Sequence, residues 1–235
     1  MTMSAILHHI QSESQSQTAK KLSRPSLVRL QRYLEELMLL QATGQEHVTS
    51  AELAARTEIT SETVRQDLCG LKADGRPRVG YEVDHLVNIL RAVFDLDSAK
   101  PICLVGLGTL GRALAASDIW KRCGFRLVEV FDSSPDVAGS FFNGLLVRNI
   151  KELIGVLRMR DIKAAVLAAP ADAAQAVADV LVTAGVKSIW NFAPVCLHVP
   201  DDVIVENQFL GWGLITLSYR SSAAAANEQP GEGKE

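Results

Sequence analysis

The chain has 235 residues, of which 48% are hydrophobic, and its formal net charge is −3. This length allows one large domain or two ordinary ones, with enough apolar residues for a buried core. Because the net charge is small, any surface that binds nucleic acid must be local. No apolar run has transmembrane length, and the N-terminus lacks a signal-peptide core, so we expect a soluble cytoplasmic protein.

Composition divides the chain into four predicted parts. Residues 1–19 are rich in Ser and Gln, and residues 221–235 are small and polar, so we expect a disordered arm and a disordered tail. Residues 20–97 have a helical pattern, whereas residues 98–220 alternate strands and helices, as in an α/β parallel doubly wound sheet. The four cysteines lack zinc spacing, so we predict free thiols and no metal site.

The first half contains the pattern of a winged helix-turn-helix domain. Apolar residues recur at helical spacing in residues 26–41 and 62–71, and the capping box Thr49-Ser50-Ala51-Glu52 opens a short helix between them. Ser61 is a candidate N-cap of the third helix. Residues 75–83 are predicted to form a tight hairpin, which would be the wing.

Local basic clusters make DNA the expected partner of this half. Arginines and lysines neutralise phosphates, and polar side chains on a third helix can bond base edges in the major groove. The predicted DNA contacts are Arg29, Ser50, Ser61, Thr63, Arg65, Gln66, Lys72, Arg76, Arg78 and Tyr81. Small three-helix domains also mediate protein contacts, so a protein-binding surface is the alternative.

The second half opens with an apolar strand at residues 102–105 that runs into a Gly-x-Gly-x-x-Gly turn and then a helical segment. The first glycine allows a tight turn, the second lets a phosphate approach the backbone, and the third packs the helix on the strand. A dinucleotide pyrophosphate is therefore expected at Gly106, Leu107, Gly108, Thr109, Leu110 and Gly111. A structural glycine turn in another α/β unit is the alternative.

Later strand ends extend this site. The strand at residues 127–131 ends in Asp132, 21 residues after Gly111, where an acid binds the adenosine ribose and favours NAD(H) over NADP(H). Further strands are predicted at residues 145–147, 164–167, 188–191 and 203–206, and helices at 110–120, 150–158, 173–184 and 211–220. Two strand ends at the carboxyl edge add the cofactor candidates Ala169, Pro170, Asn191, Phe192, Ala193 and Pro194, although Ala169-Pro170 also fits a plain turn and Phe192 a core position.

Both halves together resemble the Rex family, bacterial transcriptional repressors that sense the NADH/NAD+ ratio. The resemblance spans about residues 25–219 and includes Val64-Arg65-x-Asp67-Leu68, Val79-Gly80-Tyr81-x-Val83, Phe131-Asp132, Asn191-Phe192-Ala193-Pro194 and Leu217-Ser218-Tyr219. It implies a homodimer with a swapped C-terminal helix, bound to palindromic double-stranded operator DNA. NADH would release the DNA, and NAD+ would compete with it. The resemblance places residues 191–194 near the nicotinamide and Phe209 against it across the dimer.

The chain departs from the family pattern at three positions. Members often carry a basic residue at Gln66 and Ser at Cys69, and some carry at Gln208 an Asp that links cofactor state to the DNA-binding domain. The segment at residues 209–217 is apolar on all faces, which indicates burial on more than one side, against a partner or within its own domain.

Two other functions fit parts of the sequence. A small NAD-dependent dehydrogenase would need a proton donor or acceptor, and the nearest candidate, His198, has no carboxylate partner in a local motif. A CoA-binding module would share the glycine-rich turn, but Asp132 argues mildly against it. No second substrate domain is available either, because the first half is predicted to form the winged helix. The favoured interpretation is therefore a sensor without catalytic residues.

Overall fold

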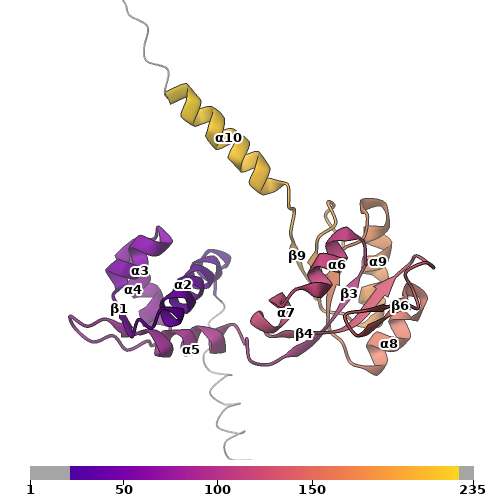
Figure 1. The fold of residues 1–235 in the computed structure, drawn as a ribbon, viewed down its shortest axis with the longest axis horizontal. Coiled ribbons are helices and arrows are strands. Elements are labelled where there is room, and N and C mark those ends of the chain that lie inside the picture. The colour runs from indigo at the N-terminus through magenta and orange to yellow at the C-terminus, as the bar shows by residue number, and fades with distance from the viewer. Residues whose placement is uncertain (1–21, 228–235) are drawn as a thin grey trace, which may run out of the picture. The chain divides into compact units, whose positions relative to one another are not determined.

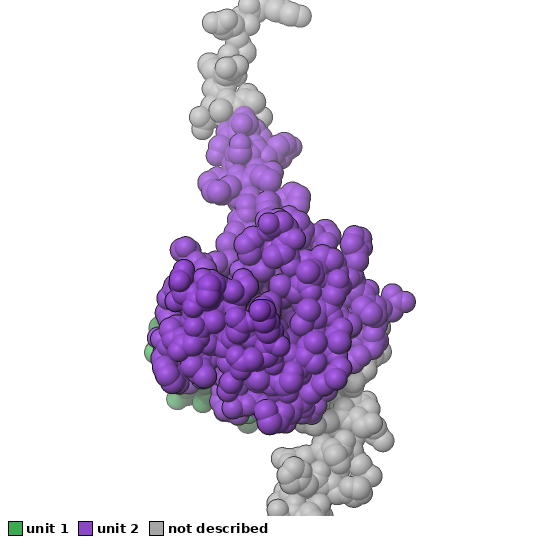
Figure 2. Space-filling view, turned by 90° about the vertical axis from the view of Figure 1, so that its right-hand side faces the viewer, with its two compact units in different colours: residues 1–97 green, residues 98–235 purple. Residues whose placement is uncertain are grey.

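A computed structural model describes residues 22–227, so the arm predicted at residues 1–19 lies outside the described part of the chain. The chain divides into two compact units, Met1–Asp97 and Ser98–Glu235 (Figure 2). This boundary falls where the sequence pattern changes from helical to alternating. Within residues 22–227 no helix is long and apolar enough to cross a membrane.

Unit 1 is a helical domain with one short sheet (Figure 1). Its elements are α2 (Arg24–Ala42), β1 (His47–Val48), α3 (Ser50–Thr57), α4 (Ser61–Gly70), β2 (Tyr81–Glu82) and α5 (Val83–Val93). The apolar stripes of the four helices meet in a common core that includes Leu37, Val64, Leu68, Leu86 and Leu90. Helix α5 was not predicted, although its buried residues follow helical spacing: Val83, Leu86, Val87 and Leu90.

The wing differs from the predicted tight hairpin. Within residues 75–83 the pairing is a single bridge between Arg76 and Gly80, and β2 instead pairs antiparallel with β1. Gly80 makes this possible, since its φ is +96° and a Cβ would lie 2.4 Å from the carbonyl oxygen of Val48.

The helix N-caps were only partly predicted. Thr49 caps α3 as expected, and its Oγ1 accepts a hydrogen bond from the backbone of Glu52 at 3.1 Å. The N-cap of α4 is Thr60 and not Ser61, because Thr60 has the extended backbone and its Oγ1 accepts from the backbone of Thr63. Ser61 is the first residue of the helix.

Unit 2 is a seven-stranded sheet in the order β5-β6-β4-β3-β7-β8-β9. The strands are β3 (Lys100–Val105), β4 (Phe125–Asp132), β5 (Phe141–Phe142), β6 (Leu145–Asn149), β7 (Ala164–Leu167), β8 (Ser188–Asn191) and β9 (Ile204–Asn207). The six predicted strands run parallel, and the added edge strand β5 pairs antiparallel with β6. Numbered along the chain, the parallel strands have the 3-2-1-4-5-6 order of a Rossmann fold.

Helices cover both faces of this sheet. They are α6 (Thr109–Ala116), α7 (Ile119–Arg122), α8 (Leu153–Met159), which follows the 3₁₀ turn η1 (Ile150–Glu152), and α9 (Ala171–Ala184). Successive residues of β3 alternate between two cores: Cys103 and Val105 pack with α8 and α9, whereas Ile102 and Leu104 pack with α6 and α7. Burial raises the pKa of the Cys103 thiol to about 12, as fits a core residue.

The C-terminal helix, α10 (Trp212–Asn227), is longer than predicted. The composition from residue 221 onward predicts a disordered tail, but residues 221–227 continue the helix. A run of alanines explains the difference, because Ala has the highest helix propensity. The predicted tail at residues 228–235 lies outside the described residues.

Candidate functional site

The glycine-rich turn joins the end of β3 to the start of α6. Gly106 has a φ of +97°, and a Cβ there would lie 2.5 Å from the carbonyl oxygen of Ala168, so the position requires glycine. A Cβ on Gly111 would lie 1.9 Å from the carbonyl oxygen of Gly106, which confirms that α6 packs tightly on the turn. At Gly108 no atom lies within 4 Å of the Cβ position, so the backbone there is open to a ligand.

Asp132 is the last residue of β4 and lies beside this turn. Its Oδ2 accepts a hydrogen bond from the backbone of Leu107 at 2.6 Å, and its Oδ1 accepts from the backbone of Ser134 at 2.8 Å. The carboxylate is therefore fixed, with lone pairs left for further donors such as ribose hydroxyls. The Leu107 amide, predicted to bind the pyrophosphate, is engaged by Asp132 in this structure.

A pocket of about 850 Å³ lies at the carboxyl edge of the sheet, within the size range of small-molecule sites. It lies beside the ends of β3 and β7, where the strand order reverses and where Rossmann sheets bind their ligands. Of the predicted cofactor residues, the pocket is lined by Gly106, Gly108, Leu110, Asp132, Ala169, Pro170 and Phe192.

The other predicted residues do not line this pocket: Leu107, Thr109, Gly111, Asn191, Ala193, Pro194 and Phe209. Sequence reasoning missed a wall formed by Ile150, Lys151 and Ile154, and a second wall from α9. The signal was available, since β6 also ends at this edge immediately before Ile150. Lys151 is the one basic residue among those that line the pocket.

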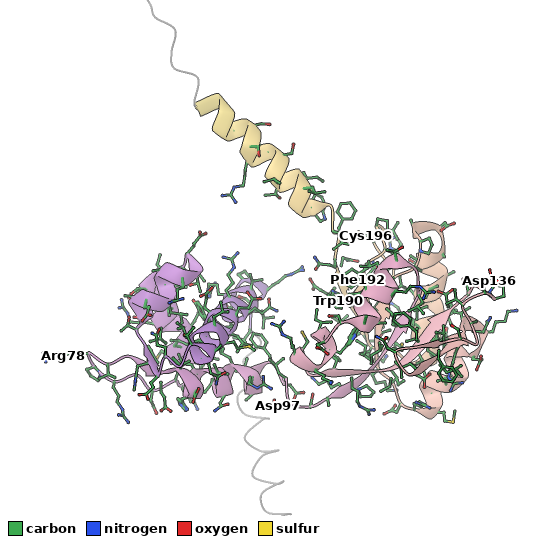
Figure 3. The ribbon with its side chains drawn as sticks, in the orientation of Figure 1. Arg78, Asp97, Asp136, Trp190, Phe192 and Cys196 are labelled. Atoms are coloured by element: carbon green, nitrogen blue, oxygen red, sulfur yellow. The ribbon has the colours of Figure 1, made fainter. Side chains whose placement is uncertain are left out.

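Asn191 is buried, and its side chain forms hydrogen bonds that hold the loop after β8. Its Nδ2 donates to the carbonyl oxygen of Val195 and to Oδ1 of Asn207, both at 2.8 Å, and its Oδ1 accepts from the backbone of Ala193 at 3.0 Å. Both amide protons are used, so the side chain shapes the loop and has no donor left for a ligand. Phe192 leaves this loop toward the pocket, and its ring lies 4.4 Å from that of Trp190 (Figure 3).

His198, the residue considered for proton transfer, does not line the pocket. Its backbone is held by Gln175, whose side-chain amide both donates to and accepts from it at 2.9 Å. Among residues 22–227 no group of three His, Cys, Asp or Glu residues could hold a metal ion. The nearest candidate of the dehydrogenase alternative therefore lies outside the pocket.

The predicted DNA contacts lie mainly on α4 and the wing. Arg65, Gln66, Lys72, Arg76 and Arg78 are exposed, and Ser50, Ser61, Thr63 and Tyr81 are half-buried. Figure 3 shows Arg78 at the tip of the wing. On α4 the exposed Arg65 pairs with Glu62 at 2.6 Å and lowers the pKa of that carboxyl, so Glu62 offsets part of the positive charge on this face.

Arg29 differs from the other predicted contacts because it is bound within the domain. Its Nε and Nη2 donate to the two carboxylate oxygens of Asp67 at 2.7 and 2.8 Å, and the buried Tyr33 hydroxyl donates to Oδ2 at 3.0 Å. Burial, with the hydrogen bond to Asp67, raises the pKa of the Tyr33 phenol, which stays protonated and donating. This network fixes α4 on α2, so Arg29 positions the predicted recognition helix.

A winged-helix unit followed by a Rossmann unit with an open glycine-rich turn defines a ligand-responsive, DNA-binding regulator. The comparisons with known proteins agree for each half. Residues 21–69 match a family described as "Putative DNA-binding protein N-terminus", and residues 97–195 match one described as "CoA binding domain". Over most of its length, the chain belongs to the Rex family of redox-sensing transcriptional repressors.

Two curated relatives illustrate the match, and both carry the name "Redox-sensing transcriptional repressor Rex". The protein of Thermoanaerobacter sp. (strain X514) is 38% identical over 83% of this chain and 85% of its own. That of Bacteroides thetaiotaomicron is 33% identical over 81% of this chain and 86% of its own. Since these relatives are repressors, the family is not one of enzymes.

Solved structures of RSP, a Rex-family repressor, have the same fold. The complex of RSP with β-NAD+ and operator DNA is 34% identical and covers 88% of this chain and 96% of its own, with a TM-score of 0.81. The complex of RSP with β-NADH is 33% identical and covers 89% of this chain and 98% of its own, with the same TM-score of 0.81.

Proposed function

We propose that this protein is a cytoplasmic repressor that binds palindromic operator DNA as a homodimer and leaves it when NADH binds. The observation that carries the proposal is the open backbone at Gly108 beside the fixed carboxylate of Asp132 in a pocket of about 850 Å³. A dinucleotide needs both features, a close approach for its phosphates and an acceptor for its ribose.

Each part of the pocket has a task in holding NAD(H). The backbone of Gly108, with the start of α6, would face the pyrophosphate, and Asp132 would accept from the adenosine ribose. Phe192 would face the ring end of the cofactor. A 2′-phosphate would lie against the Asp132 carboxylate, so NADP(H) would bind more weakly. Lys151 also lines the pocket, and its positive charge would reduce that discrimination.

The exposed residues of α4 and the wing support the operator contact. Gln66 can bond adenine, and Arg65, Lys72, Arg76 and Arg78 can contact phosphates or guanine. Arg29 is proposed to act indirectly, because both carboxylate oxygens of Asp67 hold its guanidinium. Two such units at a fixed spacing would explain why the operator is palindromic.

The homodimer is proposed because α10 exposes an apolar surface. Every described side chain from Trp212 to residue 223 is exposed. The large exposed apolar residues of α10 and of the turn before it are Phe209, Leu210, Trp212, Leu214, Ile215, Leu217 and Tyr219. So large an exposed apolar surface marks an interface, and the family resemblance assigns it to the partner subunit.

Sedimentation velocity tests this assembly. Leu214, on α10, is 72% exposed in the single chain, and Leu214→Glu should shift the protein from dimer to monomer because it would bury a carboxylate in the interface. Met159→Glu is the matched control, since Met159 is 79% exposed on α8, and this variant should remain dimeric. A dimer that survives Leu214→Glu would contradict this arrangement.

The function is tested by titrating NADH into a complex of the protein with a palindromic duplex that the protein itself has selected from a random library. We expect operator affinity to fall about a hundredfold. This change requires NADH to bind the DNA-incompetent state more tightly than the DNA-competent state by at least that factor. Excess NAD+ should oppose the release. Operator affinity that is indifferent to NADH would refute redox sensing.

CoA is the control ligand in the same titration, because the family matched by residues 97–195 is described as a CoA binding domain. We expect CoA neither to release the operator nor to displace NADH. Release by CoA alone would assign the pocket to CoA and leave the DNA-binding half of the proposal intact.

A further inference from the structure

Asn191 and Asn207 form a side-chain pair that connects the pocket to the start of α10. The two residues are opposite each other in the register of the parallel strands β8 and β9, and both are the last residues of their strands. Asn191 Nδ2 donates to Asn207 Oδ1 at 2.8 Å, and the Asn191 carbonyl oxygen accepts from the backbone of Gln208 at 2.8 Å. Two hydrogen bonds therefore hold residues 207–208 to Asn191, the buried last residue of β8.

The same asparagine also holds the loop that reaches the pocket. Its remaining bonds go to Val195 and Ala193, which close the loop around Phe192. Phe192 lines the pocket and packs against Trp190. A ligand that shifts the backbone at Phe192 would disturb a loop whose hydrogen bonds meet at the Asn191 amide, both protons of which are already used.

On the other side of the pair the chain leads directly into α10. Phe209 follows Gln208, and its ring lies 5.5 Å from that of Trp212, the first residue of the helix. The Asn191 side chain therefore bonds both to the loop at residues 192–195 and, through Asn207, to the end of β9. These hydrogen bonds form a continuous path from the loop to the residues from which α10 begins.

We propose that Asn191 and Asn207 are positioning residues that couple occupancy of the pocket to the placement of α10. The inference rests on the proposed function, since it concerns how NADH binding would reach the dimer and hence the operator. Neither side chain touches the ligand in this scheme. Removal of Asn207 should therefore separate ligand binding from its effect on DNA.

The test measures two affinities and their coupling in the full-length protein. The coupling ratio is the operator Kd with saturating NADH divided by the operator Kd without it. For Asn207→Ala we expect the NADH Kd and the ligand-free operator Kd to stay within about threefold of wild type, while the ratio falls at least about tenfold, a loss typical of a disrupted coupling element. Asn207→Asp, which keeps the acceptor oxygen for Asn191, should restore most of the ratio.

Asp202→Ala is the matched control. The ion pair between Asp202 and Lys187 links the segments that precede β9 and β8. It lies at the opposite end of these strands from Phe192. This variant should keep the wild-type ratio. A general loosening of β9 would instead lower the ratio in Asp202→Ala as well, and that result would overturn the proposal.

Hydrogen exchange supplies a readout that does not depend on DNA. In wild type, NADH should slow amide exchange in residues 208–215, and in Asn207→Ala this protection should be absent although NADH is bound. An unchanged ratio in Asn207→Ala, or a ratio that Asn207→Asp fails to restore, would reject the coupling role. A wild-type ratio near one would refute the proposed function itself and the inference with it.

Discussion

Gly108→Ala should abolish useful NADH binding and leave the fold intact. The new methyl group meets no atom within 4 Å, and the φ of −68° at this position suits alanine, so the unfolding temperature should be equal or slightly higher. The methyl group instead occupies the place where a phosphate must approach the backbone. We expect a loss of about a hundredfold in NADH affinity, which corresponds to about 2.8 kcal/mol, measured by fluorescence titration.

Gly111→Ala is the contrasting variant. Its methyl group would lie 1.9 Å from the carbonyl oxygen of Gly106, a backbone atom that moves only with the whole turn. Overpacking of this kind costs about 1–3 kcal/mol, so the melting temperature of unit 2 should fall by several degrees.

Full NADH affinity in Gly108→Ala would place the pyrophosphate elsewhere, whereas an unfolded Gly108→Ala would contradict the open space at this turn.

Asp67→Ala should strongly destabilise the DNA-binding unit. It removes the bidentate partner of Arg29 and leaves the hydroxyl of Tyr33, a fully buried residue, without its acceptor. A partly buried ion pair broken on one side, together with an unsatisfied hydroxyl, costs about 2–4 kcal/mol. Chemical denaturation should show this loss, and operator affinity should fall because α4 is no longer fixed on α2.

Two companion variants separate the contributions to this loss. Asp67→Asn keeps an acceptor for Tyr33 but loses the charge, so it should be destabilised less than Asp67→Ala. Glu62→Ala removes the pair with Arg65, whose side chains are 65% and 54% exposed. Exposed pairs contribute little to stability because solvent screens them, so the stability of Glu62→Ala should be nearly that of wild type. Equal losses in Asp67→Ala and Glu62→Ala would show that the Arg29 network does not hold the domain together.

Local patterns predicted much of this molecule because they report local physics. Glycine spacing, strand length and apolar periodicity are properties of short segments, and they located the turn at Gly106–Gly111, Asp132 at the end of β4 and the helix that carries Arg65. They failed where two distant segments decide the outcome. The pairing of β2 with β1, for example, depends on Gly80 lying against Val48.

Site residues show the same division. Arg29 and Asn191 have the chemistry of ligand-binding residues, and only the structure shows the partners that engage them: Asp67 lies 38 residues from Arg29, and Asn207 lies 16 residues from Asn191. Conversely, Ile150 and Lys151 carry no motif beyond their place just after a predicted strand, and they enter the pocket because β6 ends beside β4.

The sequence by itself determined the two-unit organisation, the parallel sheet and the glycine turn that is open at Gly108, since each follows from residues adjacent in the chain. The tertiary structure alone decided which polar groups remain available. A donor or acceptor satisfied inside the protein cannot also bind a ligand at full strength, and such satisfaction depends on residues brought together from distant parts of the chain. In the folded protein Arg29 and Asn191 are therefore held by partners from elsewhere in the chain, whereas Asp132 lines the pocket.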